Sequence, residues 1–68
     1  MKNRIEEIRK EKNIRQEEFA AALGVSRQTI SSLENGRYNP SILLAYKIAK
    51  FFDMTIEDVF CFDEEDLK

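Results

Sequence analysis

Residues able to read the edges of nucleic-acid bases gather on one side of a predicted helix in the middle of the chain. At about 100° per residue, Ile30 and Leu33 define the inward direction of that helix. The residues within roughly 50° of the opposite direction are Gln28, Ser31, Ser32 and Asn35. Arg27 stands at the shoulder of this uncharged face. In a major groove, Gln pairs with adenine and Arg with guanine, whereas an ordinary solvated face more often carries Lys and Glu pairs. The face therefore predicts contacts to the bases of double-stranded DNA.

A sharp turn between two short helices is needed to present this face. Ala20 is small enough for a second helix to approach, and Gly24, four residues later, can take the left-handed conformation that ends the first helix. Ser26 can accept a backbone N–H in the first turn of the second helix, and Val25 can pack on Ile30. These spacings predict a helix-turn-helix over residues 16–33.

The chain resembles the lambda-like repressors, the Cro/Xre-type helix-turn-helix family, over about residues 4 to 60. The matching residues are Arg9, QEEFAAALGVSRQTISSLENG at 16–36, NPS at 39–41 and KIAKFF at 47–52. The resemblance implies an all-α, lambda-repressor-like domain of five helices. One departure is Arg15, where the family usually has a Ser or Thr cap, although Ile14 can still pack on Phe19 and Glu18 stands at the third helical position.

The resemblance also implies roles for individual side chains. It places Arg27, Gln28 and Ser32 on base edges, with Ser31 beside them. Residues implied to hold phosphates are Gln16, Asn35, Arg37 and Tyr38.

Glu34 is expected to be partly buried, because it lies about 70° from the inward direction of its helix. A carboxylate at the negative end of a helix dipole is unfavourable and needs a cation. In the family that this chain resembles, the residue matching Arg9 typically pairs with the one matching Glu34. That pair is expected here.

The remaining elements are predicted from caps and apolar spacing. The first helix covers residues 4–12 after an Asn3 cap, and the fourth begins with Asn39 as cap and Pro40 in the first turn and ends near Phe52. Thr55 and Asp58 predict a capping box for a short fifth helix, with Met54 packed on Val59. Alternating residues also predict a short two-stranded sheet between residues 1–4 and 59–62.

The fourth helix has more apolar surface than one small core can use. Its predicted inward stripe is Ile42, Ala45, Ile48, Ala49 and Phe52. Leu44 and Phe51 lie on another face, and Phe60 and Phe62 add to the surplus. We expect these last four residues to form a homodimer interface. Scattered surface residues, or a C-terminus folded over the helix, are alternative interpretations.

Charge is segregated along the chain, whose net charge is −2. Residues 1–50 contain ten Lys and Arg against six Glu, whereas residues 51–68 contain one Lys against seven Asp and Glu. We therefore expect a DNA-binding domain over residues 1–62 and an acidic tail over residues 63–68. Screening confines attraction to about 10 Å, so an acidic tail that points away need not prevent DNA binding.

Composition argues against an enzyme, a metal site or a cofactor. The chain has no His and a single Cys, Cys61, which is interpreted as a small apolar residue near the end of the fifth helix, with redox sensing as the alternative. The acidic residues 63–66 lack the glycine turn of a calcium loop. No apolar run is long enough for a secretory signal or a membrane span, so a cytoplasmic location is expected.

The resemblance implies a sequence-specific transcriptional regulator, most simply a repressor that occupies an inverted-repeat operator as a homodimer. Activation through a polymerase contact is an alternative. A second alternative is an antitoxin or control protein of a small gene pair, which would also bind a protein partner. A third is a helical interaction module whose acidic end mimics nucleic acid.

Overall fold

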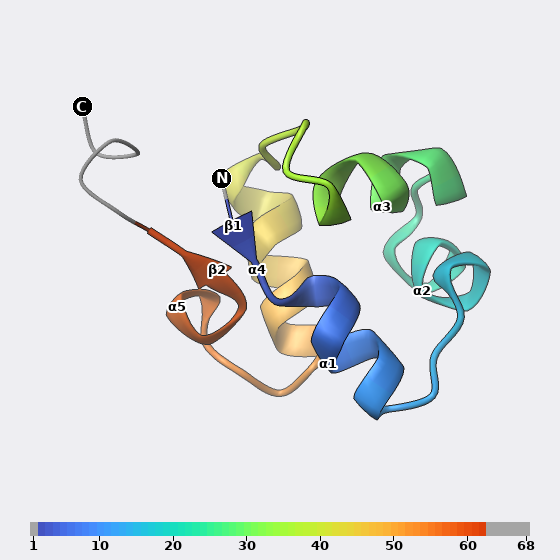
Figure 1. Ribbon diagram of the computed structural model, residues 1–68, viewed down its shortest axis with the longest axis horizontal. Helices are drawn as coiled ribbons and strands as arrows, with labels where there is room; N and C mark the ends of the chain where they lie inside the picture. Colours follow the sequence, from blue (N-terminus) through green and yellow to red (C-terminus); the bar gives the residue numbers. More distant parts are fainter. Residues whose placement is uncertain (1, 63–68) are drawn as a thin grey trace.

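Five helices and one pair of short strands make up residues 2–62, the part of the chain that this computed structural model describes. In chain order they are β1 (Lys2–Asn3), α1 (Ile5–Glu11), α2 (Gln16–Leu23), α3 (Arg27–Glu34), α4 (Ile42–Phe51), α5 (Ile56–Val59) and β2 (Phe60–Cys61). α1 and α4 occupy the middle of the molecule, with α2 and α3 on one side and α5 with the strands on the other (Figure 1). The predicted five-helix fold is confirmed.

The predicted strand pair is also confirmed. β1 and β2 run antiparallel, with Lys2 opposite Cys61 and Asn3 opposite Phe60. Cys61 is exposed on β2, two residues beyond the end of α5, so it lies near the end of the fifth helix as expected but within a strand. The sheet joins the two ends of the described chain beside α5 (Figure 1).

The core draws on every helix. Its buried apolar residues are Ile5, Ile8, Phe19, Ala20, Leu23, Ile30, Leu33, Ala45, Ile48, Ala49, Phe52, Val59 and Phe60. Phe19 of α2 stacks on Phe52 at the end of α4 with 5.0 Å between ring centroids, and Phe51 meets Phe19 edge-on at 5.2 Å. Aromatic pairs of this kind contribute about 0.5–1.5 kcal/mol beyond their burial, so they help hold α2 against α4.

Four helices end in the same way, with one residue in the left-handed region: Asn13, Gly24, Gly36 or Asp53. The N–H of the next residue then bonds back to the last helical turn, as the Schellman motif requires. After α1, α2 and α4 that next residue is apolar and packs on the core: Ile14, Val25 and Met54. After α3 it is Arg37, which is exposed.

The starts of the helices follow the predicted caps in part. Ser26 accepts the Thr29 N–H at 3.1 Å, and Thr55 and Asp58 form the expected reciprocal capping box. At α2 the Arg15 side chain caps nothing, and the Glu18 carboxylate accepts the Arg15 N–H at 3.4 Å. This single bond replaces part of what a Ser or Thr would supply.

The start of α4 was predicted two residues too early. Ser41, not Asn39, is the cap, because its hydroxyl accepts the Leu44 N–H at 3.1 Å while its own backbone is extended. Ile42 then falls in the first turn, beyond the edge of the core, and is 83% exposed. Its placement in the inward stripe is wrong, whereas Ala45, Ile48, Ala49 and Phe52 are buried as expected.

One of the residues expected at a dimer interface, Phe60, is held inside the monomer instead. Phe60 is only 1% exposed, because its pairing with Asn3 in the sheet turns the side chain into the core. Leu44 is half-buried against the same core. Large apolar side chains remain exposed at Ile42, Leu43, Tyr46, Phe51 and Phe62. The predicted acidic tail, residues 63–68, lies outside the described residues, in which no helix is long and apolar enough to cross a membrane.

Candidate nucleic-acid interface

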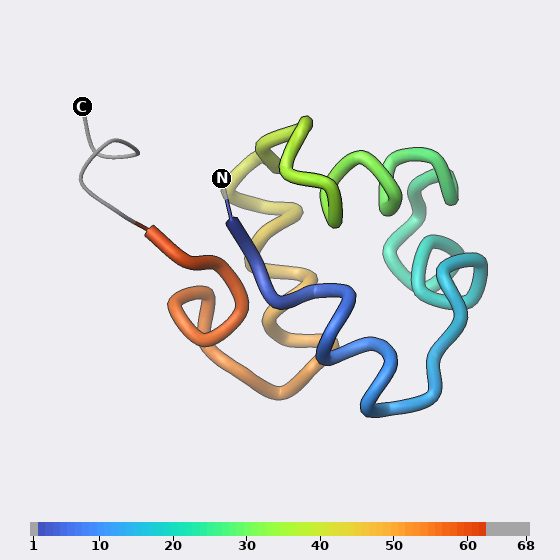
Figure 2. The backbone as a smooth tube through the Cα atoms, viewed as in Figure 1, coloured from blue at the N-terminus to red at the C-terminus, as the bar shows by residue number. Residues whose placement is uncertain are grey.

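The turn between α2 and α3 presents α3 at the edge of the molecule (Figure 2). Gly24 ends α2 with φ at 73°, and Ser26 starts α3 two residues later. Ile30 and Leu33 are fully buried, which fixes which side of α3 faces outward. The predicted helix-turn-helix is therefore present with the expected orientation.

The side chains predicted to read bases share the outward side of α3, although not equally. Arg27 and Gln28 are exposed, and Ser31 and Ser32 are half-buried. Asn35, Arg37 and Tyr38 are exposed just after the helix, and Gln16 is half-buried at the start of α2. All of these residues lie on or beside the α2–α3 unit, which makes joint contact with one ligand feasible.

A shallow depression of about 270 Å³ connects the helix to the chain that follows it. It is lined by Ser26, Gln28, Thr29, Ser32 and Tyr38. Thr29 was not among the residues predicted for this surface. Its helical-wheel position, about 70° from the inward direction, is the signal that could have suggested partial exposure.

Arg9 and Glu34 form an ion pair that joins α1 to the end of α3. Arg9 Nε lies 2.7 Å from Glu34 Oε2, and the side chains are 9% and 3% exposed. A second guanidinium nitrogen donates to the Ile14 carbonyl at 2.8 Å, which ties the loop before α2 to the same arginine. Each buried polar atom of this pair has a hydrogen-bond partner, which offsets the cost of removing the two charges from water.

Asn3 makes a second connection to α3 that sequence reasoning missed. Its Nδ2 donates to the Leu33 carbonyl at 2.7 Å, while its Oδ1 accepts the Ile5 N–H at 3.1 Å. Asn3 thus accepts one N–H of the first turn, but it is not the N-cap as predicted, because α1 begins one residue later, at Ile5, and its N-cap is Arg4, which makes no side-chain capping bond. The bond to Leu33 spans 30 residues, and no local pattern signals it.

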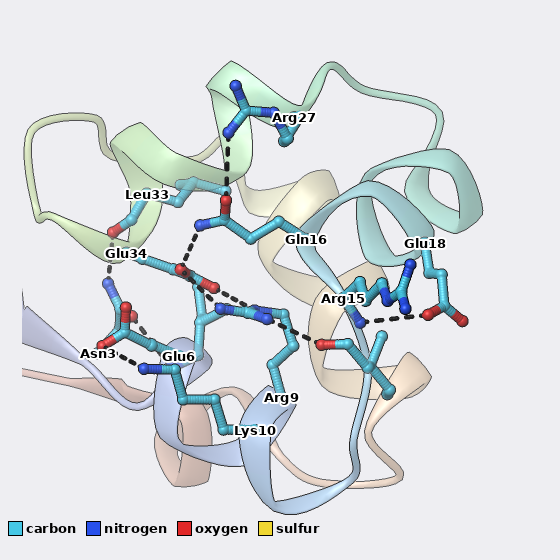
Figure 3. Close-up of polar contacts among 12 residues, drawn as sticks. Asn3, Glu6, Arg9, Lys10, Arg15, Gln16, Glu18, Arg27, Leu33 and Glu34 are labelled. Atoms are coloured by element: carbon cyan, nitrogen blue, oxygen red, sulfur yellow. Dashed lines mark hydrogen bonds and ion pairs between the residues drawn. The ribbon is translucent and has the colours of Figure 1, made fainter.

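Gln16 lies between the ion pair and the first residue of α3 (Figure 3). Its amide nitrogen donates to Glu34 Oε1 at 2.9 Å, and its amide oxygen accepts from Arg27 Nη1 at 3.5 Å. A chain of contacts therefore runs from the buried Arg9 to the exposed Arg27 (Figure 3).

The basic side chains of the molecule differ in whether they form ion pairs with acidic side chains. On α1, Lys10 faces Glu6 at 3.8 Å, and Arg4 bonds Glu7 at 2.9 Å, which raises the pKa of Arg4 above its usual value. Arg37, by contrast, has no ion pair within residues 2–62. The only acidic residue of α3 is Glu34, which faces inward to Arg9. An anionic ligand would thus meet little negative charge on the outer side of α3.

Comparisons with known proteins agree with this arrangement. A helix-turn-helix family model matches residues 5–59. An uncharacterized HTH-type transcriptional regulator of Archaeoglobus fulgidus is 57% identical over 98% of this chain and 94% of its own length. Another from Methanocaldococcus jannaschii, MJ0272, is 50% identical over 97% of this chain and the whole of its own.

Among solved structures, the clp gene regulator ClgR of Corynebacterium glutamicum is similar with a TM-score of 0.73 and 28% identity. The match covers 79% of this chain and 57% of that one. With a family model over most of its length and relatives above half identity, this chain belongs to the Cro/Xre-type helix-turn-helix family of non-enzymatic, DNA-binding transcriptional regulators.

Proposed function

We propose that this member of the family is a repressor that binds an inverted-repeat operator as a homodimer in the cytoplasm. The observation that carries the proposal is the outward side of α3, where the exposed Arg27 and Gln28 stand on a hydrogen-bonding surface without an exposed acidic residue. Repression would follow from occupation of the operator against polymerase.

Base reading falls to Arg27, Gln28, Ser31 and Ser32 in this proposal. The first two carry the forked or bidentate groups that distinguish guanine and adenine in the major groove. The hydroxyls, half-buried beside them, suit shorter contacts at the same groove edge.

Phosphate contacts fall to Asn35, Arg37 and Tyr38. Arg37 directly follows the left-handed residue that ends α3. After the other three left-handed residues, this position holds an apolar residue that packs on the core. The exposed arginine at this position therefore supports a role in binding rather than in packing. Tyr38 shares the depression with Gln28 and Ser32, so it flanks the reading residues directly. The N-terminal ends of α2 and α3 add exposed positive dipole ends.

A second copy fits the apolar surface at the start of α4. Ile42 projects beside a depression of about 250 Å³ lined by Pro40, Ile42, Ala45, Ile56, Phe60 and Phe62. None of these residues is charged. In a two-fold interface, the projecting Ile42 of each copy could fill the depression of the other copy. Of the four residues predicted for the interface, Phe60 and Phe62 line this depression, whereas Leu44 and Phe51 do not, and Ile42 is added to the proposed interface.

Selection of bound duplexes from random DNA tests base reading. The enriched sites should be inverted repeats with half-sites about 10 base pairs apart from centre to centre. Gln28→Ala should cost about 1–3 kcal/mol on the enriched site and little on random DNA. Equal losses on both would show that Gln28 does not read sequence.

Sedimentation tests the interface. Ile42→Glu should place a charge in the apolar depression and yield monomers. Leu43→Glu, the control, introduces the same charge at the next residue, which does not line the depression, and should leave the dimer intact. A wild-type monomer at tens of micromolar that binds a single half-site one to one would disprove the dimer.

A further inference from the structure

Five exposed residues share the outward side of α4. At about 100° per residue, the buried residues of this helix set its inward direction. Within about 70° of the opposite direction lie the residues that we call the α4 outer face: Leu43, Tyr46, Lys47, Lys50 and Phe51. The three uncharged side chains are 62%, 52% and 42% exposed, in chain order. Large apolar side chains that cluster beside charges are typical of an interaction surface.

A depression of about 500 Å³ lies where this face meets the end of α2. It is lined by Ala22, Leu23, Tyr46, Lys47, Lys50 and Phe51, none of which is acidic. Apart from the two amino groups and the Tyr46 hydroxyl, these side chains are apolar. A hollow of this composition can accept one large apolar side chain of a partner, with polar contacts at its rim.

Contacts within the monomer hold the aromatic rings of the α4 outer face. Phe51 meets the buried rings of Phe19 and Phe52 edge-on, with 5.2 and 5.8 Å between ring centroids. Lys50 Nζ lies 5.9 Å from the centre of the Tyr46 ring, within the range of a cation–π contact. Side chains that neighbours already hold lose little conformational entropy when a partner binds. The face is therefore largely preformed.

The charge of the α4 outer face is positive. α4 contains no acidic residue, and neither Lys47 nor Lys50 forms an ion pair within residues 2–62. Glu57 lines a neighbouring depression that Lys50 also borders, but it does not pair with this lysine. A complementary ligand brings carboxylates to the lysines and an apolar side chain to the depression. A nucleic-acid backbone would supply only the negative charge.

The α4 outer face is separate from the reading side of α3. Its depression shares no residue with the one beside α3 or with the one beside Ile42. On α2, Ala22 lies about 160° around the helix from Ala20, the buried small residue that lets α3 approach. A partner on the α4 outer face therefore leaves α3 free for DNA.

We propose that the α4 outer face binds an acidic segment of a partner protein. An aromatic or leucine side chain of that segment enters the depression, while its carboxylates meet Lys47 and Lys50. The site lets a second protein bind the regulator while α3 is on DNA. The proposal does not depend on base reading by α3, so it can be tested without an operator.

Selection of displayed random dodecapeptides on the immobilised wild-type protein identifies the preferred chemistry. The enriched peptides should carry several Asp or Glu residues around an aromatic residue or leucine. A synthetic copy of the most enriched peptide is then titrated into the isotope-labelled protein. Its amide chemical shifts should change at Ala22 and along residues 46–51, and they should change equally when a random DNA duplex is already bound.

The double variant Lys47→Glu, Lys50→Glu should weaken binding of this peptide about 10-fold or more, because two attractions become repulsions. Tyr46→Ala, which removes an exposed ring without changing the charge, should weaken it about 5- to 30-fold. The matched control is Lys2→Glu, Lys12→Glu, which makes the same change of charge at two exposed lysines outside the face and should bind normally. Thermal midpoints check that every variant folds.

Enrichment of peptides without a surplus of acidic residues, or of no peptide at all, would overturn the inference. Shift changes confined to other residues, or equal losses for the two lysine double variants, would do the same. A change of oligomeric state in Lys47→Glu, Lys50→Glu alone would mean that a second copy, not a partner protein, occupies the face. A larger loss of affinity for random DNA in that variant than in the control would identify a nucleic-acid contact instead.

Discussion

At the scale of single residues, Arg9 is the only charged residue of the described chain that is buried as a whole. It reaches Glu34 on α3 and the Ile14 carbonyl before α2, so one guanidinium joins three segments. Deleting one partner of such a pair leaves the other charge buried and unpaired, which costs far more than loss of a surface pair.

Arg9→Met should accordingly destabilise the protein by roughly 3–5 kcal/mol, measured from denaturant unfolding. The double change Arg9→Met, Glu34→Leu should recover part of that loss, because neither charge then remains. Additive losses in this cycle would disprove the coupling. Lys10→Met, which breaks only the exposed contact to Glu6, is the control and should cost less than about 1 kcal/mol.

At the scale of elements, the residues that end the helices differ in how easily they adopt the left-handed conformation. Asp53 ends α4 with φ at 58°, a conformation that costs an ordinary L residue about 1–2 kcal/mol and glycine almost nothing. Its carboxylate also lies near the negative end of the α4 dipole.

Asp53→Gly should therefore stabilise the protein by about 0.5–1 kcal/mol, since the relief of strain exceeds the entropy that glycine adds to the unfolded chain. The urea midpoint measures it. Asp53→Ala removes the charge but keeps the Cβ, so it should gain less. If the two variants gained equally, the charge and not the backbone would be the cause.

The capping box of α5 should make stability depend on pH. Bonds from the Thr55 backbone and hydroxyl lower the pKa of Asp58 below its usual value. The folded state therefore favours the ionised carboxylate, and this contribution is present above the unfolded pKa and is lost as the pH falls through the folded pKa. Between pH 7 and about pH 2, the wild type should lose more stability than Asp58→Asn, mostly below about pH 4. Parallel unfolding curves for the two proteins would contradict the prediction.

At the scale of the whole molecule, the net charge is negative, whereas the charge around α3 is positive. The chain carries −2 overall, yet α3 has no exposed acid and is flanked by Arg27 and Arg37. Because salt screens charges beyond about 10 Å, the local field governs contact with phosphates.

Arg37→Ala should weaken binding to enriched and random DNA alike, and it should reduce the slope of log affinity against log salt by about one. Gln28→Ala, a neutral control in the adjoining depression, should leave the slope unchanged. A slope unaltered by Arg37→Ala would mean that Arg37 meets no phosphate.

Features whose causes lie within one helical turn could be predicted from the amino-acid sequence. The left-handed Gly24, the Ser26 cap, the Thr55–Asp58 box and the inward Ile30 and Leu33 all follow from neighbours three or four residues away. The resemblance to a known family, not local spacing, supplied the expected pairing of Arg9 with Glu34.

Where several residues could make the same contact, the packing of whole elements selected the one that does. Ser41 and not Asn39 caps α4, although both residue types are good caps. Phe60 is buried and Ile42 exposed because the sheet and the edge of the core, rather than hydrophobicity, set their surroundings. Asn3 reaches Leu33, and Gln16 reaches Glu34, across 30 and 18 residues. Such contacts depend on how whole elements pack, because the partners of a polar side chain at that separation are fixed by the path of the chain and not by local spacing.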